Sequence, residues 1–218
     1  MPPARPHFSR SQPWVLTFGV AAALWGVGTV FAHSGAIGVA PPVTGLTIDG
    51  DLSDWPSTIP VSAIAHAEYG DRPTDDDDLG AWLRAAYDAE QGRLYIGVQV
   101  RDQSLVADPS NPNNWQSQDG CELYVDPGHG VEESSVVQFA LYGGVSVGSG
   151  SEILERGWQR TADGYQVEWA VSLARSSTEP ADLRVPRSIG FDLSLSDRDV
   201  DDSFSWLAWG PGTSKLGS

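Results

Sequence analysis

The sequence is poor in cysteine and in basic residues. It contains one cysteine, Cys121, so no disulfide can form within the chain. Cys121 falls inside a predicted strand, where a small buried hydrophobic side chain is expected rather than a reactive thiol. Lys215 is the only lysine. The chain has 13 basic and 29 acidic residues, which give a formal net charge of −16. A surface with this charge repels nucleic-acid phosphates and anionic lipids, so no nucleic-acid partner is expected.

Familiar catalytic signatures are also missing. The chain has no G-x-S-x-G, P-loop, H-E-x-x-H or G-x-G-x-x-G pattern, and it has only four histidines. Paired carboxylates could still make a glycoside hydrolase, with Glu122, Asp126 and Glu168 as candidates. Each of these lies in or beside a predicted strand, and the sequence defines no separation between them. Hydrolysis is therefore the least favoured function.

Residues 1–34 are predicted to be a signal peptide or an N-terminal membrane anchor. Arg5 and Arg10 precede the uncharged run 14–32, and small residues suited to signal peptidase lie near its end. The run is also long enough to stay uncleaved as a single membrane anchor. Both alternatives export the rest of the chain, which is then secreted, periplasmic or anchored. A linker rich in Gly, Pro and Ala follows over residues 35–46.

Residues 47–218 are predicted to form one all-β domain. No helix-period segment exceeds two turns, whereas period-2 alternation is frequent. Two hairpins are expected, one turning near Gly92 and one at Asp163-Gly164. We therefore predict an antiparallel β-sandwich of jelly-roll type. A last strand is expected after Trp209, so truncation of the domain and further domains beyond Ser218 are open alternatives.

The segment from Trp115 to Pro127 carries the strongest functional signal. Trp115 lies in a polar loop without apolar neighbours, and Glu122 follows on an alternating strand. An indole packs on the C–H face of a sugar ring, and a carboxylate accepts hydrogen bonds from its hydroxyls. Packing of Trp115 against its own loop is the alternative. Trp206 and Trp209 are candidates for a second aromatic wall.

Acidic runs offer oxygen ligands for a hard cation. The run 75–78 consists of four aspartates, and Asp197, Asp199, Asp201 and Asp202 surround Arg198. Calcium prefers such ligands, but neither run has the fixed spacing of an EF-hand loop. A solvated acidic loop is the favoured interpretation of both runs, with calcium binding as the alternative.

Four segments resemble, in order, motifs of family 9 carbohydrate-binding modules. They are Ile48–Pro56 ("IDG-x-x-x-x-W"), Tyr87-Asp88 with Leu94–Asp102, Trp115 with Asp119–Pro127, and Gly164–Val171 ("GY-x-x-E"). The resemblance implies a β-sandwich that holds sugar between two Trp rings. Trp115 would form one wall, Trp206 or Trp209 the other, and Glu122 would accept from hydroxyls. It also implies structural calcium, for which Asp126, Asp76 and Asp78 are the candidate ligands.

The predicted function is therefore non-catalytic binding of an oligo- or polysaccharide by an exported module. Two departures from the family pattern keep an alternative open. Val171-Ser172 replaces the "I-P" that usually closes the "GY" strand, and the final strand is missing. The alternative is a sensory or structural ectodomain of the same fold, anchored in the membrane and without sugar binding.

Overall fold

The computed structural model describes residues 36–108, 110–111, 114–126, 137–142, 145–147, 153–173 and 188–211. The predicted export segment, Pro127 and the residues after 211 lie outside this part of the chain. Among the described residues, no helix is long and apolar enough to cross a membrane.

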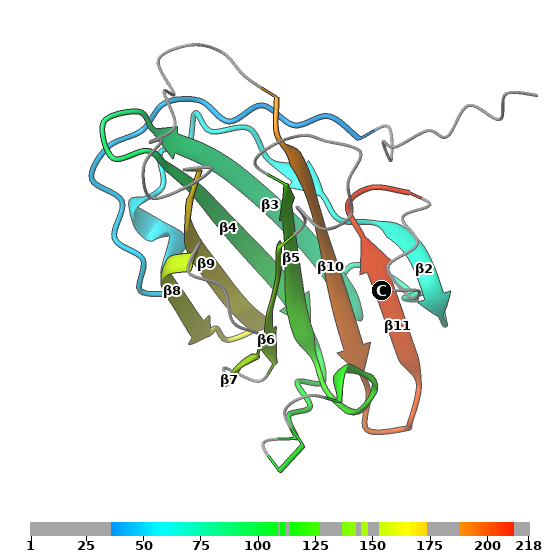
Figure 1. Ribbon diagram of the computed structural model, residues 1–218. Coiled ribbons are helices and arrows are strands. Elements are labelled where there is room, and N and C mark those ends of the chain that lie inside the picture. The colour runs from blue at the N-terminus through cyan, green and yellow to red at the C-terminus, as the bar shows by residue number, and fades with distance from the viewer. Residues whose placement is uncertain are drawn as a thin grey trace, which may run out of the picture. The chain divides into compact units, whose positions relative to one another are not determined.

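Two antiparallel sheets face each other (Figure 1). Sheet A has the strand order β1 (Ser62–Ala63), β3 (Leu79–Asp88), β4 (Arg93–Asp102), β9 (Gly164–Ser172) and β8 (Ile153–Arg160). Sheet B has the order β2 (His66–Gly70), β11 (Phe204–Ala208), β10 (Gly190–Arg198), β5 (Gly120–Asp126), β6 (Val137–Tyr142) and β7 (Val145–Val147). Two short 3-10 helices, η1 (Leu52–Asp54) and η2 (Trp115–Ser117), lie in connections. The predicted all-β sandwich of jelly-roll type is confirmed.

Both predicted hairpins are present. β3 pairs with β4 across a turn in which Gly92 has a φ of 65°, and β8 pairs with β9 across the Asp163-Gly164 turn. Gly164 has a φ of 146°, and a Cβ atom there would lie 2.2 Å from the Val100 carbonyl oxygen. Glycine is therefore required at this turn by both conformation and space.

The core between the sheets follows the period-2 pattern of the strands. β4 contributes Leu94, Ile96, Val98 and Val100 to the core, and sheet B contributes alternate residues of β5 and β10. Cys121 is fully buried among them, and burial raises the pKa of its thiol. It is a core side chain, as predicted from its position in a strand.

The outer face of sheet A is covered by residues 43–59, which we call the strap. Leu52, Trp55 and Ile59 of the strap form a second apolar cluster with sheet residues Ala86, Tyr95 and Ala170. The strap is joined to the sheet by the backbone bond from the Val43 N–H to the Tyr87 carbonyl, at 2.8 Å. This face of the sandwich is therefore occupied by the chain itself.

Candidate functional site

Four aromatic rings meet on the outer face of sheet B. Trp115 lies 5.0 Å from Trp206, 5.5 Å from Phe204 and 6.5 Å from Tyr69, measured between ring centroids. We call these four residues the aromatic cluster. Trp206 is 3% exposed and Tyr69 is 48% exposed, while Trp115 is half-buried. The cluster therefore has a buried base and a solvent-facing side formed by Trp115 and Tyr69.

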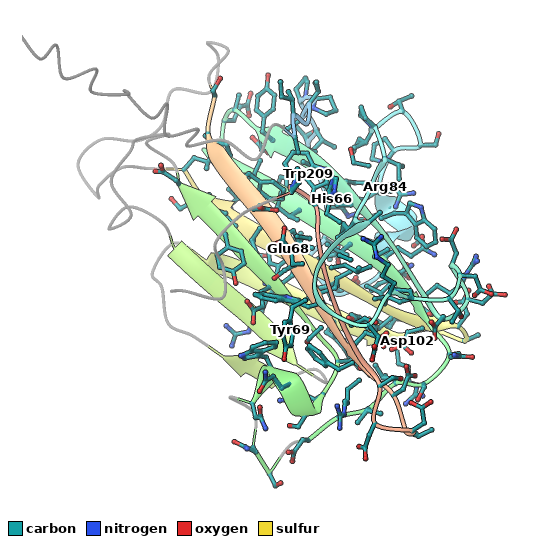
Figure 2. The ribbon with its side chains drawn as sticks, turned by 90° about the vertical axis from the view of Figure 1, so that its right-hand side faces the viewer. His66, Glu68, Tyr69, Arg84, Asp102 and Trp209 are labelled. Atoms are coloured by element: carbon teal, nitrogen blue, oxygen red, sulfur yellow. The ribbon has the colours of Figure 1, made fainter. Side chains whose placement is uncertain are left out.

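Strand register creates this cluster from distant parts of the chain. Trp206 on β11 is opposite Ser196 on β10 and opposite Tyr69 on β2. Leu207, its neighbour, points into the core, so Trp206 points outward. Figure 2 shows Tyr69 near the lower end of the strands, well away from Trp209 near the upper end.

The loop between Asp102 and Asp119, which we call the Trp115 loop, brings Trp115 onto the sheet. The buried side chain of Gln118 organises it. Its Oε1 accepts from the Asp108 N–H at 3.1 Å, and its Nε2 donates to the carbonyls of Asn111 and Asn114 at 3.2 Å. The backbone carbonyl of Gln118 also accepts from the Ser196 hydroxyl at 3.1 Å, which fastens the loop to β10.

Glu122 lies on the same outer face as the aromatic cluster. On β5 it is opposite Ser194, while its neighbours Cys121 and Leu123 enter the core. It is 5% exposed and accepts a hydrogen bond from the Tyr124 hydroxyl. Burial, followed by the Glu122 charge, raises the pKa of Tyr124, so this phenol stays protonated and remains a donor.

The two candidate second walls have different positions. Trp209 is 9% exposed and belongs to the core, where its ring meets Phe191 edge-on at 5.3 Å. Of the two alternatives, only Trp206 contacts Trp115. The rings of Trp115 and Trp206 are packed together, with 34° between their planes. Trp115, with Trp206 buried beneath it, is therefore a platform and does not face Trp206 across a slot with room for a sugar.

The glycosidase candidates do not converge. Glu168 is fully buried on the outer face of sheet A, under the strap. Glu122 and Asp126 lie in β5 of sheet B, on the outer face of the opposite sheet. The whole thickness of the sandwich separates Glu168 from these two, so it cannot share a cleft with either of them.

A second cluster of chemical interest lies between the sheets. Carboxylate oxygens of Asp102, Asp119 and Asp197 lie within 4.8 Å of one another, and all three residues are buried. Asp102 ends β4, Asp119 precedes β5, and Asp197 lies one residue before the end of β10. We call these residues the aspartate triad. Figure 2 shows Asp102 toward the lower end of the strands.

The triad is poorly compensated by neighbouring charge. Burial is the main cause that raises the pKa of Asp119 to about 9 and that of Asp197 to about 8, with repulsion from Asp102 adding to both. Burial also raises the pKa of Asp102. Two carboxylates about 4 Å apart repel each other by roughly 4 kcal/mol at the effective dielectric typical of proteins. The arrangement thus favours an added positive charge, carried by a cation or by protons.

The residues predicted as metal ligands do not join this triad. Asp78 accepts hydrogen bonds from the Thr74 N–H and the Gln103 amide, at 2.6 and 2.8 Å. Asp76 lies in the same exposed loop, whereas Asp126 lies at the opposite end of β5 from Asp119. A strand of this length spans about 20 Å. The structure therefore does not bring Asp126 together with Asp76 and Asp78.

The triad fits a hard cation better than those residues do. It offers only oxygen ligands, which suit calcium, and no nitrogen or sulfur ligand for zinc. Asp102 Oδ2 and Asp197 Oδ1 are buried and accept no hydrogen bond from the described residues. Of the triad, Asp197 is a calcium candidate from the sequence, whereas Asp102 and Asp119 are not, although a signal for all three was available. Each aspartate continues an inward-facing series of apolar residues at the end of its strand.

Comparisons with known proteins agree with this architecture. A sequence model of the carbohydrate family 9 binding domain-like family matches residues 48–214. A family 9 carbohydrate-binding module from Caldicellulosiruptor kristjanssonii, solved with cellotriose, is 17% identical with a TM-score of 0.61, over 78% of this chain and 82% of that one. Its complex with glucose gives the same identity and TM-score, over 78% and 84%. Comparison with curated protein sequences finds no significant match.

The family model covers well over half of the chain, from the strap to the residues that follow β11. It includes every strand of both sheets and all members of the aromatic cluster and the aspartate triad. The chain therefore belongs to the carbohydrate family 9 binding domain-like family.

Proposed function

We propose that this domain binds a glucose-based oligo- or polysaccharide, without catalysis, on the outer face of sheet B. The observation that carries the proposal is the half-buried Trp115 ring, supported from below by Trp206 and Phe204 and flanked by Tyr69. Such a ring presents a flat apolar surface to the C–H face of a sugar. Complexes of the C. kristjanssonii module with cellotriose and glucose support the ligand class.

The sugar lies on the solvent side of the cluster rather than between two rings. A ring inserted between Trp115 and Trp206 would have to separate two indoles whose centroids are 5.0 Å apart. A ring on the exposed side contacts Trp115 and Tyr69 without that rearrangement. Glu122, on the same face, supplies a hydrogen-bond acceptor for hydroxyl groups, and the single proton of the Tyr124 hydroxyl is donated to Glu122.

Calorimetric titration with cellotriose and glucose tests the proposal. Trp115→Ala should weaken binding by roughly 1–3 kcal/mol, as expected for an aromatic anchor. Trp82→Ala is the matched control, because Trp82 is also half-buried but lies on sheet A, where it stacks with Arg101 at 5.6 Å. Equal losses in the two variants, or no binding by the unaltered protein, would overturn the proposal.

Two further variants separate platform binding from binding in a slot. Tyr69→Ala should weaken cellotriose binding if the sugar lies on the exposed side of the cluster. If the sugar instead enters between the indoles, Trp206→Ala should remove binding while Tyr69→Ala leaves it nearly unchanged. The pattern of the two losses therefore decides where the ring lies.

We also propose that the domain acts outside the cytoplasm, after export directed by residues 1–34. The support is the uncharged run 14–32 behind Arg5 and Arg10. N-terminal sequencing of the protein recovered from the cell envelope and the medium tests this. A new N-terminus near residue 34 indicates cleavage, an intact N-terminus in the membrane fraction indicates anchoring, and recovery from the cytoplasm alone contradicts export.

A further inference from the structure

Arg84 on sheet A is a half-buried arginine without an acidic partner among the described residues. The part of the chain that the structure describes holds four half-buried arginines. Arg93, Arg101 and Arg198 each form an ion pair with a carboxylate. Arg84 forms neither an ion pair nor a hydrogen bond with any described residue, although the chain carries 29 acidic residues. Its guanidinium therefore lacks the counter-charge that partly buried charges normally have.

Arg84 lies on the outer face of sheet A, next to the strap. Leu83, its neighbour on β3, points into the core, so Arg84 points outward. Arg84 is opposite Gly97 on β4, where a Cβ atom would lie 2.8 Å from Leu52 and 2.9 Å from Trp55 of the strap. The strap thus covers the neighbour of Arg84, and Arg84 lies at the boundary between the covered and the half-exposed parts of this face.

Trp82 separates Arg84 from the acidic loop that precedes β3. Trp82 lies two residues before Arg84 on the same face, and its ring extends in the other direction, over Gly80. A Cβ atom at Gly80 would lie 2.7 Å from the Trp82 ring. The Arg101 guanidinium lies 5.6 Å from the centroid of this ring and pairs with Asp77 of the loop at 3.2 Å. The Asp77 carboxylate is therefore used on the far side of Trp82 from Arg84.

A row of glutamines crosses the same face of sheet A. It consists of consecutive partners in the strand register, Gln99 on β4, Gln166 on β9 and Gln159 on β8, and we call it the glutamine row. The row begins beside Trp82, which is opposite Gln99, so Gln99 is diagonal to Arg84. Gln99 and Gln166 are half-buried and Gln159 is exposed. Neighbouring strands are about 4.8 Å apart, so the row extends for about 10 Å from β4 to β8.

The amides of the glutamine row have hydrogen-bonding capacity to spare. Gln166 Oε1 accepts from the Leu52 N–H at 3.1 Å, which ties this side chain to the strap. The Gln166 NH2 group and the whole Gln99 amide have no partner among the described residues. An amide both donates and accepts hydrogen bonds, as a sugar hydroxyl does. A row of such groups therefore fits a ligand with several hydroxyls.

We propose that Arg84 and the glutamine row bind a uronic-acid oligosaccharide, at a second site on the other sheet from the aromatic cluster. A guanidinium holds a carboxylate through two parallel hydrogen bonds, which is the counter-charge that Arg84 lacks. The amides of the row then pair with hydroxyl groups of the same chain. This inference goes beyond the proposed function and does not depend on it, because the two surfaces belong to different sheets.

The acidic surface of the chain does not prevent this contact. The formal net charge is −16, but physiological salt screens exposed charges that are more than about 8 Å apart. A carboxylate that pairs directly with Arg84 gains charge-assisted hydrogen bonds, which are stronger than interactions between screened surface charges. A neutral sugar leaves the guanidinium unpaired. The site therefore selects acidic over neutral oligosaccharides, whereas the aromatic cluster has no such requirement.

The first experiment is a calorimetric titration of the full chain with trigalacturonate and with a glucuronic-acid trisaccharide. A chelator is present, so that no metal ion can bridge acidic groups of protein and sugar. At least one probe should bind, and its methyl ester, which lacks the charge, should not. Arg84→Gln should weaken binding about tenfold or more, as expected for a hydrogen-bonded charge pair. Arg156→Gln is the matched control, because it removes the same charge from an exposed arginine of β8 that is opposite Trp169, outside the row.

Two further readouts separate a binding role from a structural one. Arg84→Lys keeps the charge but loses the paired donors, so its affinity for the uronate should lie between those of Arg84→Gln and the unaltered protein. In NMR spectra, the side-chain NH2 signals of Gln99 and Gln166 should shift when the uronate is added. The NH2 signal of Gln118, which is buried in the Trp115 loop, should stay in place. Shifts at Gln118 alone would contradict the inference.

Competition with cellotriose distinguishes the two sites. Excess cellotriose should leave uronate binding unchanged, and Trp115→Ala should retain it. The inference is wrong if neither uronate binds, if Arg84→Gln and Arg156→Gln lose the same affinity, or if cellotriose displaces the uronate. Uronate binding that depends on Arg84, without any binding of cellotriose, would contradict the proposed function alone. Cellotriose binding without uronate binding would contradict this inference alone.

Discussion

Glu168 accepts a hydrogen bond from the Trp55 indole nitrogen, at 2.6 Å, although the two residues are 113 positions apart. The same carboxylate accepts from the backbone N–H groups of Gly50 and Asp49, at 2.6 and 3.0 Å. Glu168 is fully buried, and its three donors explain how a carboxylate is tolerated under the strap. The first family-like motif, Ile48–Pro56, is therefore hydrogen-bonded to the last one, Gly164–Val171.

Trp55→Phe should lower the free energy of unfolding by about 1–3 kcal/mol, because it leaves a buried carboxylate with one donor fewer. Urea unfolding at neutral pH measures the change. Glu155→Gln is the control, since Glu155 is half-exposed in its ion pair with Arg93 and should contribute no more than about 1 kcal/mol. A Trp55→Phe effect no larger than the control would show that apolar packing alone holds the strap.

Gly50→Ala should destabilise the domain far more than Gly45→Ala. Both glycines have positive φ, 95° and 79°, so alanine costs about 1–2 kcal/mol at either position. A Cβ atom at Gly50 would also lie 2.6 Å from the Trp158 carbonyl carbon, whereas Gly45 has nothing within 4 Å. We expect Gly50→Ala to cost at least about 2 kcal/mol more in urea unfolding. Equal losses of stability in the two variants would mean that the strap shifts away from the Trp158 backbone to accommodate the added methyl group.

Trp206→Ala and Trp115→Ala should differ in their effect on stability. Trp206 is 3% exposed, and its removal should cost about 3–5 kcal/mol. Trp115 is half-buried on a loop, so its removal should cost about 1–2 kcal/mol while having the larger effect on sugar affinity. Urea unfolding beside the cellotriose titration gives both quantities. A Trp115→Ala cost equal to that of Trp206→Ala, without loss of affinity, would assign Trp115 to packing.

In the presence of a chelator, the protein should become less stable as pH rises from about 4 to about 9. Asp119 and Asp197 have folded-state pKa values of about 9 and about 8, against a usual value of 3.8. Between these limits the folded protein binds protons that the unfolded chain has released, so stability falls with rising pH. Thermal unfolding across this range measures the slope.

Asp197→Asn should reduce that slope, because it removes one of the carboxyl groups with a raised pKa. A stability that is flat or increases over this pH range would contradict the raised pKa values. Asp76→Asn is the control variant, because it removes a carboxylate of the exposed loop 75–78, outside the triad.

Much of the fold could be predicted because alternation and turn residues are local signals. The inward series Leu94, Ile96, Val98 and Val100 follows from its period of two alone, and the turn at Gly164 follows from its residue types. The site was harder, since a Trp in a polar loop is compatible with both packing and ligand contact. The choice between Trp206 and Trp209 as the partner of Trp115 required the structure. Trp206 lies on the outer face of β11, and Trp209, just after β11, lies in the core.

Local sequence by itself determined the two hairpins and the faces of the clearly alternating strands, because these follow from a period of two and from turn chemistry. Only the tertiary structure decided which strand ends meet. Asp102, Asp119 and Asp197 are separated along the chain, and their distances in space do not follow from their positions in the sequence. Sheet pairing and the stacking of the two sheets bring their carboxylates within 4.8 Å, and they bring Glu168 to Trp55. Long-range contacts of this kind depend on the whole sandwich, whereas alternation depends on a few neighbouring residues.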